Sequence, residues 1–171
     1  MGLFDIFRRP KTDEAAILRA DSPTERRAKP RKHARPGTKV LIIDDSKTVC
    51  TVLRKMLREN GFTTYEAYNG ESGIELAGKE LPELIFLDIV LPGINGFEAL
   101  RRMRRSAEIS HIPVIMISGN ESATEQFYVQ RIGANDFMKK PFSRAEVFTR
   151  VERVLNLVPT VLKPAASDIV R

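Results

Sequence analysis

The sequence predicts an α/β fold in which five parallel strands form one doubly wound sheet, in the strand order 2-1-3-4-5. Three short runs, at residues 40–43, 84–87 and 114–117, consist wholly of apolar residues. Such runs are typical of strands that are buried on both faces. They alternate with segments whose apolar residues recur at helical spacing, which indicates successive strand–helix units. Two further units complete the set of five, which suits a doubly wound sheet.

The first two units show clear helix boundaries. The apolar run 40–43 is the first strand. Ser46 can cap the helix that follows, and Asn60-Gly61 can end it, because glycine readily adopts the left-handed conformation found after helices. Residues 62–67 alternate between polar and apolar side chains as a second strand, and a short helix is expected over residues 71–79.

The other three units repeat this pattern. The third strand, 84–87, leads into a turn that contains Leu-Pro-Gly. Ser143 can cap the closing helix. The elements expected after the third strand are helix 96–105, strand 114–117, helix 121–132, strand 136–139 and helix 144–157.

Polar side chains follow four of the five strands. They are Asp44 and Asp45, Asp88, Ser118, and Lys140. Each has an ordinary local explanation, since aspartate and serine cap helices and Lys-Pro is a common loop sequence. In the predicted order, however, these four strands are neighbours, and doubly wound sheets bind ligands at the carboxyl ends of their strands.

This convergence predicts a particular chemistry. Three carboxylates packed together repel each other and raise each other's pKa unless a positive charge intervenes. A hard divalent cation such as Mg²⁺ relieves the repulsion, and it accepts carboxylate, water and phosphate oxygens as ligands. Ser118 and Lys140 are suited to contact a phosphate.

Four segments of the chain resemble the receiver domain of two-component response regulators, which has a flavodoxin-like (βα)5 fold. The resemblance spans residues 39–157, with all five units in the expected order. The segments are VLIIDDS at 40–46, LIFLDIVLPG at 84–93, PVIMIS at 113–118 and DFMKKPF at 136–142.

The resemblance implies a role for each candidate residue at the acidic end of the sheet. Asp88 would be the phosphoacceptor. Asp44 and Asp45 would hold Mg²⁺, with Asp45 the direct ligand and Asp44 acting through water. The backbone carbonyl of Val90 would be a further ligand. The chain would then be a phosphoacceptor signalling protein rather than a conventional enzyme.

The resemblance also implies a switch. Ser118 and Lys140 would contact the phosphoryl oxygens, and Lys140 is preferred to Lys139 because it directly precedes Pro141. Phe137 would be the aromatic switch residue, although it has no hydroxyl group. A histidine kinase would be the phosphoryl donor, and a downstream protein would recognise the changed surface.

Two further interpretations concern the type of activity. The entry to the first helix, DDSKT at 44–48, is similar to that of receivers in chemotaxis-like systems, including those that control type IV pilus twitching motility. A haloacid-dehalogenase-type phosphatase would also form an aspartyl phosphate. That class carries a general-acid Asp two residues after the nucleophile, and this position is Val90.

The charge of the chain lies mainly in its N-terminal segment. The net charge is +6, but residues 1–38 hold ten Lys and Arg against five Asp and Glu, whereas residues 39–158 hold sixteen of each. A dedicated DNA-binding domain normally carries its own basic face, so this distribution argues against one. The single cysteine, Cys50, excludes an internal disulfide and is expected to be a packed thiol in a reducing cytoplasm.

Three regions are therefore expected. Residues 1–38 form a basic, mostly flexible extension, 39–157 the receiver domain, and 158–171 a flexible tail with no effector domain after it. An amphipathic patch within residues 1–9 could dock on a membrane or a partner through Leu3, Phe4, Ile6 and Phe7. The alternative function is a binding module that acts through this extension on an anionic membrane or nucleic acid, with the receiver as regulator. The localisation expected is cytoplasmic, with peripheral membrane association as an alternative.

Overall fold

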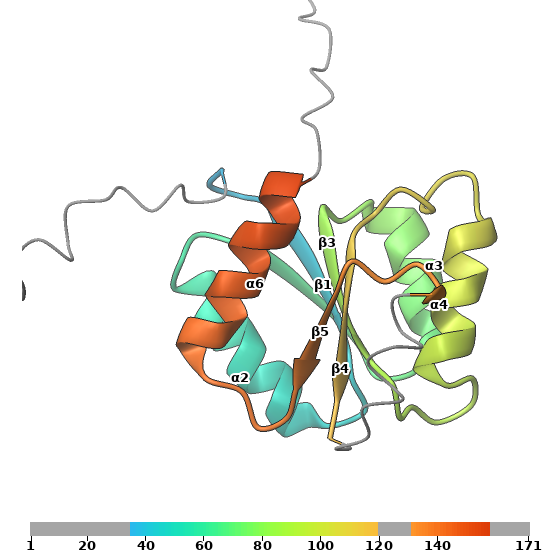
Figure 1. The fold of residues 1–171 in the computed structure, drawn as a ribbon, viewed down its shortest axis with the longest axis horizontal. Helices are drawn as coiled ribbons and strands as arrows, with labels where there is room; N and C mark the ends of the chain where they lie inside the picture. The colour runs from blue at the N-terminus through green and yellow to red at the C-terminus, as the bar shows by residue number, and fades with distance from the viewer. Residues whose placement is uncertain (1–34, 120–130, 158–171) are drawn as a thin grey trace, which may run out of the picture. The chain divides into compact units, whose positions relative to one another are not determined.

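A computed structural model of the protein describes residues 35–119 and 131–157 (Figure 1). The N-terminal patch with Leu3, Phe4, Ile6 and Phe7 lies outside the described residues, as do most of the predicted helix 121–132 and the C-terminal tail. Within the described ranges, no helix combines the length and the apolar character needed to cross a membrane.

Five parallel strands form one sheet in the order β2-β1-β3-β4-β5, as the sequence predicts. The central strands are apolar along almost their whole length because helices cover both faces of the sheet. The strands are β1 (Lys39–Ile43), β2 (Thr63–Ala67), β3 (Leu84–Asp88), β4 (Val114–Ser118) and β5 (Asp136–Lys139).

Helices lie on both faces of this sheet (Figure 1). Helices α2 and α6 cover one face, and α3 and α4 cover the other. The bounds are α2 (Lys47–Arg58), α3 (Gly70–Glu80), α4 (Gly96–Arg105) and α6 (Arg144–Leu157). The two-faced arrangement is what makes the sheet doubly wound.

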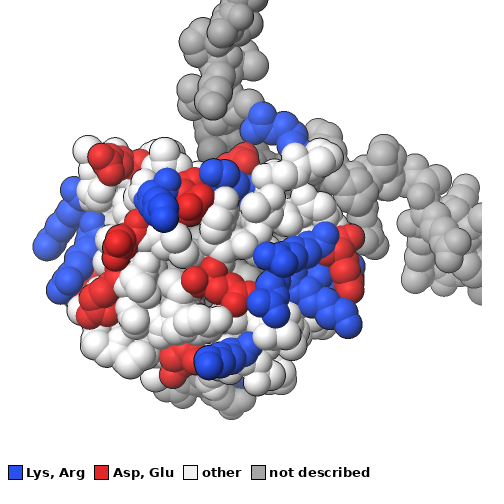
Figure 2. All heavy atoms as spheres, turned by 180° about the vertical axis from the view of Figure 1, so that it is seen from behind, with Lys and Arg blue, Asp and Glu red and all other residues white. Residues whose placement is uncertain are grey.

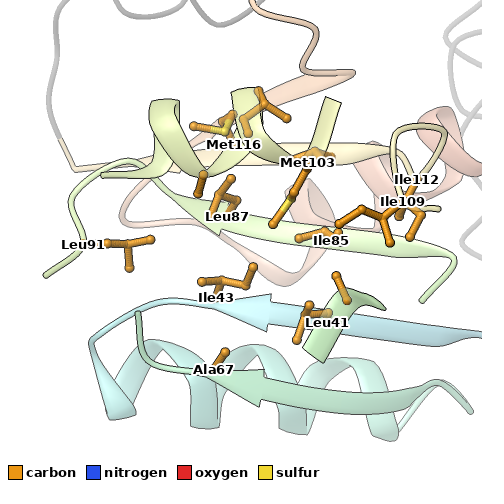
Figure 3. Close-up of a cluster of buried hydrophobic side chains, with 14 of the residues drawn as sticks. Leu41, Ile43, Ala67, Ile85, Leu87, Leu91, Met103, Ile109, Ile112 and Met116 are labelled. Carbon is orange, nitrogen blue, oxygen red and sulfur yellow. The ribbon is translucent and has the colours of Figure 1, made fainter. Parts of the chain in front are cut away.

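Alternate residues of each central strand enter different hydrophobic cores. In β1, Leu41 and Ile43 pack on the α3–α4 side, whereas Val40 and Ile42 pack on the α2–α6 side. Figure 3 shows the first of these cores, where Leu41 and Ile43 lie near Ile85 and Leu87 of β3. All four of these side chains are at most 1% exposed, so the register of the strands is strongly constrained.

Side-chain caps begin the helices, with one difference from the sequence prediction. Ser46 and Ser143 accept backbone N–H bonds at the starts of α2 and α6, as predicted. Helix α3 begins at Gly70 rather than at residue 71, because the Asn69 side chain accepts the N–H of Ser72 at 2.8 Å. The same helix ends at Glu80, and its C-cap residue Leu81 adopts a left-handed conformation (φ 47°) that is unusual for a residue other than glycine.

The first residue of α4 must be glycine for a steric reason. A Cβ atom on Gly96 would lie 2.1 Å from the backbone oxygen of Asp88. The Gly96 N–H also donates to the Ile89 carbonyl at 2.9 Å, so the backbone of α4 lies directly against the end of β3. This close approach closes the loop that follows Asp88.

We predict opposite effects for two Gly→Ala substitutions in helices. Gly96→Ala should lower the free energy of unfolding by about 3 kcal/mol, because the new methyl group would overlap a backbone oxygen. Gly78→Ala is the matched control, since the nearest atom to its added Cβ is 4.0 Å away. It should stabilise the protein by up to about 1 kcal/mol, because alanine is the better helix former. Urea denaturation measures both, and equal effects would contradict the steric account.

Candidate functional site

The four strands that end in polar residues are neighbours in the sheet, so their carboxyl ends meet. Asp44 and Asp45 follow β1, and Asp88 and Ser118 are the last residues of β3 and β4. Lys140 follows β5 directly. The order β1-β3-β4-β5 therefore brings together residues that are far apart in the chain, as the sequence predicts.

Three carboxylates form an acidic cluster at this edge. Asp44, Asp45 and Asp88 each offer an oxygen atom, and these oxygens lie within 4.8 Å of one another. Asp44 and Asp88 are buried, whereas Asp45 is exposed at the rim. The set of donors fits a hard divalent cation, which prefers oxygen ligands and completes its coordination with water.

The ammonium group of Lys140 contacts both buried carboxylates. Its Nζ lies 2.7 Å from Asp44 Oδ2 and 3.0 Å from Asp88 Oδ2, and its side chain is 22% exposed. The other oxygen of Asp44, Oδ1, accepts the backbone N–H of Ser46 at 2.9 Å. The Lys139 side chain is exposed. Lys140 is therefore the lysine that the structure brings to the acidic cluster.

The pKa values of Asp88 and Lys140 are both raised, which favours the neutral form of the carboxyl but the charged form of the ammonium. Desolvation raises the pKa of the Asp88 carboxyl and the Asp44 charge adds to the increase, although the Lys140 hydrogen bond opposes it. Burial alone would lower the pKa of Lys140, but its hydrogen bonds and ion pairs with Asp44 and Asp88 outweigh this and raise it. The lysine is therefore held in its charged form beside the carboxylates.

The loop after β3 carries Val90 next to the Asp88 carboxylate. The backbone of Val90 lowers the pKa of that carboxyl and so favours its ionised form. The Val90 side chain is 68% exposed and therefore points away from the core. The structure thus places the Val90 backbone at the site, while a metal ligand role for its carbonyl stays a prediction.

Ser118 and Phe137 lie on adjacent strands beside the cluster. Ser118 is fully buried at the end of β4, and its carbonyl accepts the backbone N–H of Lys140 at 2.8 Å. Phe137 pairs with Met116 across β4 and β5 and packs, half-buried, against the core on the α3–α4 side. Their predicted roles in a switch stay predictions.

The sequence reasoning missed two residues that support the cluster. The sequence predicts Ser46 only as a helix cap, but its backbone N–H also donates to Asp44 Oδ1. An Asp-x-Ser sequence before a helix is a known local turn signal and could have indicated this. The requirement for Gly96 had no such signal, because its contact with Asp88 depends on the tertiary position of α4.

Cys50 on α2 is a packed thiol that contacts the backbone of Asp44. Its side chain is fully buried, and its thiol donates to the Asp44 carbonyl, with Sγ 3.3 Å from the oxygen. Burial, together with the negative charges of Asp44 and Glu66, raises the pKa of the thiol to about 12. The thiol is therefore protonated throughout the neutral range.

Comparison with known proteins identifies the class to which this fold and site belong. Residues 40–152 match the model of the response regulator receiver domain. The chain belongs to the response regulator receiver family, whose domains act in signalling.

Individual relatives agree with this assignment. The chain is 38% identical over 117 residues to protein PilH of Pseudomonas aeruginosa, a match that covers 68% of this chain and 97% of PilH. The structure of a putative response regulator from Chloroflexus aurantiacus is similar with a TM-score of 0.67 and 31% identity, covering 70% of this chain and 98% of that one.

A third relative was solved with a metal ion. It is the receiver domain of a sensor histidine kinase from Pseudomonas aeruginosa, described with a magnesium ion coordinated in its active-site cleft. The similarity has a TM-score of 0.65 and 27% identity, and it covers 70% of this chain and 98% of that one.

The buried thiol leads to a prediction about pH. The unfolded thiol ionises near its usual pKa of 9.0, but the folded thiol only near about 12. Above pH 9 the folded state therefore binds more protons than the unfolded state, and stability falls as pH rises. The difference in unfolding free energy between wild type and Cys50→Ala should fall by about 1 kcal/mol from pH 8 to pH 10. A difference that stays constant in urea denaturation at both pH values would contradict the shifted pKa.

Proposed function

We propose that the chain is a two-component receiver that accepts a phosphoryl group from a histidine kinase on Asp88 and then changes a protein-interaction surface. One observation carries the proposal: the Lys140 ammonium lies between the Asp44 and Asp88 carboxylates within a cluster of three acids. A nucleophile, an acidic metal site and a cation are then next to each other at the carboxyl ends of the strands.

Asp88 is the nucleophile in this proposal. An oxygen of its carboxylate attacks the phosphorus of phosphohistidine, a P–O bond forms, the P–N bond breaks, and the bonding electrons leave with the imidazole, which holds a proton. The Asp88 carboxyl must be ionised to attack, and the contacts with Lys140 and the Val90 backbone favour that form. The Lys140 ammonium balances charge on the phosphoryl oxygens, since phosphoryl transfer depends largely on positioning and electrostatics.

Mg²⁺ would be held by Asp45, Asp88 and the backbone carbonyl of Val90, with Asp44 acting through water. When bound, it would neutralise charge on the phosphoryl oxygens and orient them. The support for this ligand set is the proximity of the three carboxylates and the exposure of Asp45, which leaves one ligand open to solvent.

The switch would use Ser118 and Phe137. The Ser118 hydroxyl would donate a hydrogen bond to the phosphoryl group, and Phe137 would move into the space that Ser118 leaves. Phe137 has no hydroxyl group, so its movement would depend on packing alone. Phosphorylation would change the local charge and packing of this surface. In this proposal, a downstream protein recognises the changed surface.

The similarity to PilH supports a role in motility signalling of the chemotaxis or type IV pilus kind. The proposed location is the cytoplasm. An enzyme of the haloacid-dehalogenase type fits less well, because Val90 has no proton to donate. A nucleic-acid or membrane function would depend on residues 1–38. Their Lys and Arg residues would bind an anionic partner, and the apolar residues Leu3, Phe4, Ile6 and Phe7 would dock on a membrane or a protein. On the face in Figure 2, acidic and basic side chains of the described residues are interspersed, which is unlike a nucleic-acid-binding surface.

The first test of the proposal concerns the acceptor. With acetyl phosphate and Mg²⁺, the wild-type protein should gain one phosphoryl group, and Asp88→Asn should gain none because an amide is not a nucleophile here. Intact-protein mass spectrometry measures both. Glu75→Gln is the matched control, since Glu75 is exposed on α3 and should leave labelling unchanged. Equal labelling of Asp88→Asn and wild type would refute the proposal.

The second test separates the two adjacent lysines. Lys140→Met should slow phosphorylation on the order of 100-fold, as for the loss of one charge-stabilising group at a reacting centre. It should also raise the pKa of Asp88 further, because the Lys140 hydrogen bond lowers it. Lys139→Met should stay within about twofold of wild type, since it removes the same charge from an exposed position. Similar losses in both variants would show that only net charge matters. The rate of acetyl phosphate labelling is the measurement.

A further inference from the structure

A carboxylate on α3 accepts a hydrogen bond from the loop between β3 and α4, which consists of residues 89–95. Glu71 Oε1 accepts the backbone N–H of Ile94 at 3.1 Å, across 23 residues of sequence. Helices α3 and α4 lie side by side on the same face of the sheet, so the start of α3 reaches the tip of this loop (Figure 1). The receiver chemistry described above does not use Glu71.

The backbone of the loop is shaped to receive this carboxylate. Gly93 has a positive φ of 78°, and a Cβ atom there would lie 2.7 Å from Glu71 Oε1. A Cβ atom on Gly70 would lie 2.5 Å from the Ile94 side chain. Two glycines thus permit the first turn of α3 and the loop to approach each other more closely than side chains would allow. The Glu71 contact is therefore built into the packing of the two elements.

The other end of the loop is attached to the end of β3. The Gly96 N–H donates to the Ile89 carbonyl, and the Ile89 N–H donates to the Ile117 carbonyl of β4 at 3.0 Å. Val90 lies between Ile89, whose backbone is hydrogen-bonded to β4, and Ile94, whose backbone is hydrogen-bonded to Glu71. Its backbone lowers the pKa of the Asp88 carboxyl, two residues earlier in the chain, whereas its side chain is exposed. The position of the Val90 backbone thus depends on both ends of the loop.

We propose that Glu71 is a positioning residue for the phosphorylation site, which holds the loop so that the Val90 backbone stays at the Asp88 carboxylate. Glu71 touches neither Asp88 nor the phosphoryl group, and it acts through the backbone of Ile94. Glu71 lies in the first turn of α3, where the helix dipole favours an acidic side chain. The inference rests on the proposed function for its consequence, but the loop geometry can be measured without it.

The test compares four variants by NMR on the unphosphorylated, full-length protein. Glu71→Ala should accelerate amide hydrogen exchange at Ile94 and Val90 and weaken Mg²⁺ binding by about tenfold, at the low end of the effect of outer supporting groups on metal affinity. Glu71→Gln keeps an acceptor oxygen and should restore both values to near those of wild type. Glu75→Ala and Glu75→Gln remove the same charge one turn further along α3 and should change neither value. Thermal unfolding checks that all variants fold.

Three outcomes would overturn the inference. If Glu71→Gln binds Mg²⁺ as weakly as Glu71→Ala, the effect is one of charge and not of the hydrogen bond. If exchange at Ile94 accelerates but Mg²⁺ affinity is unchanged, Glu71 is only a structural contact. If neither value changes, the loop does not depend on Glu71. A wild-type protein that takes no phosphoryl group from acetyl phosphate would instead refute the proposed function, and the exchange and Mg²⁺ titrations would still decide the role of Glu71.

Discussion

The contact of the Lys140 ammonium with two buried carboxylates is the interaction on which the site depends. Asp44 and Asp88 are both buried and contact the same ammonium group. Without it, their negative charges would repel each other strongly in a region with little water. A buried charge is costly unless it is paired. Lys140 supplies one positive charge from a third strand, and the remaining negative charge of the cluster is what a divalent cation would bind. The same three carboxylates therefore require the Lys140 charge and provide the site for a divalent cation.

The packing of the sheet makes this arrangement possible. Helices on both faces bury the central strands, so the polar residues at or just after the carboxyl ends of these strands are attached to a closely packed framework. The close contact of Gly96 with the Asp88 backbone continues this packing into the loop after β3. The Glu71 bond to Ile94 extends it to the tip. The phosphoacceptor proposed here thus lies at a junction of sheet, loop and two helices.

Much of this could be predicted from local sequence patterns. The apolar runs predicted the buried strands, and the alternation of five strand–helix units predicted the strand order. The polar residues after the strands predicted the acidic edge of the sheet. The beginning of α3 and the left-handed end at Leu81 were not predicted, because Asn69 was not recognised as a cap and no glycine marks the end of the helix. Glu71 gave no signal at all, because its partner Ile94 is distant in sequence and offers only a backbone N–H.

The sequence by itself determined which chemical groups are available and on which strand each one lies, because hydrophobic periodicity and residue type are local properties. The resemblance already favours Lys140 over Lys139, but only the tertiary structure shows that its ammonium contacts both Asp44 and Asp88, the latter 52 residues away in the chain. The raised pKa values of Asp88, Lys140 and Cys50 also depend on the tertiary structure. Those values arise from burial and from charges on neighbouring strands, and neither exists until the strands are packed side by side.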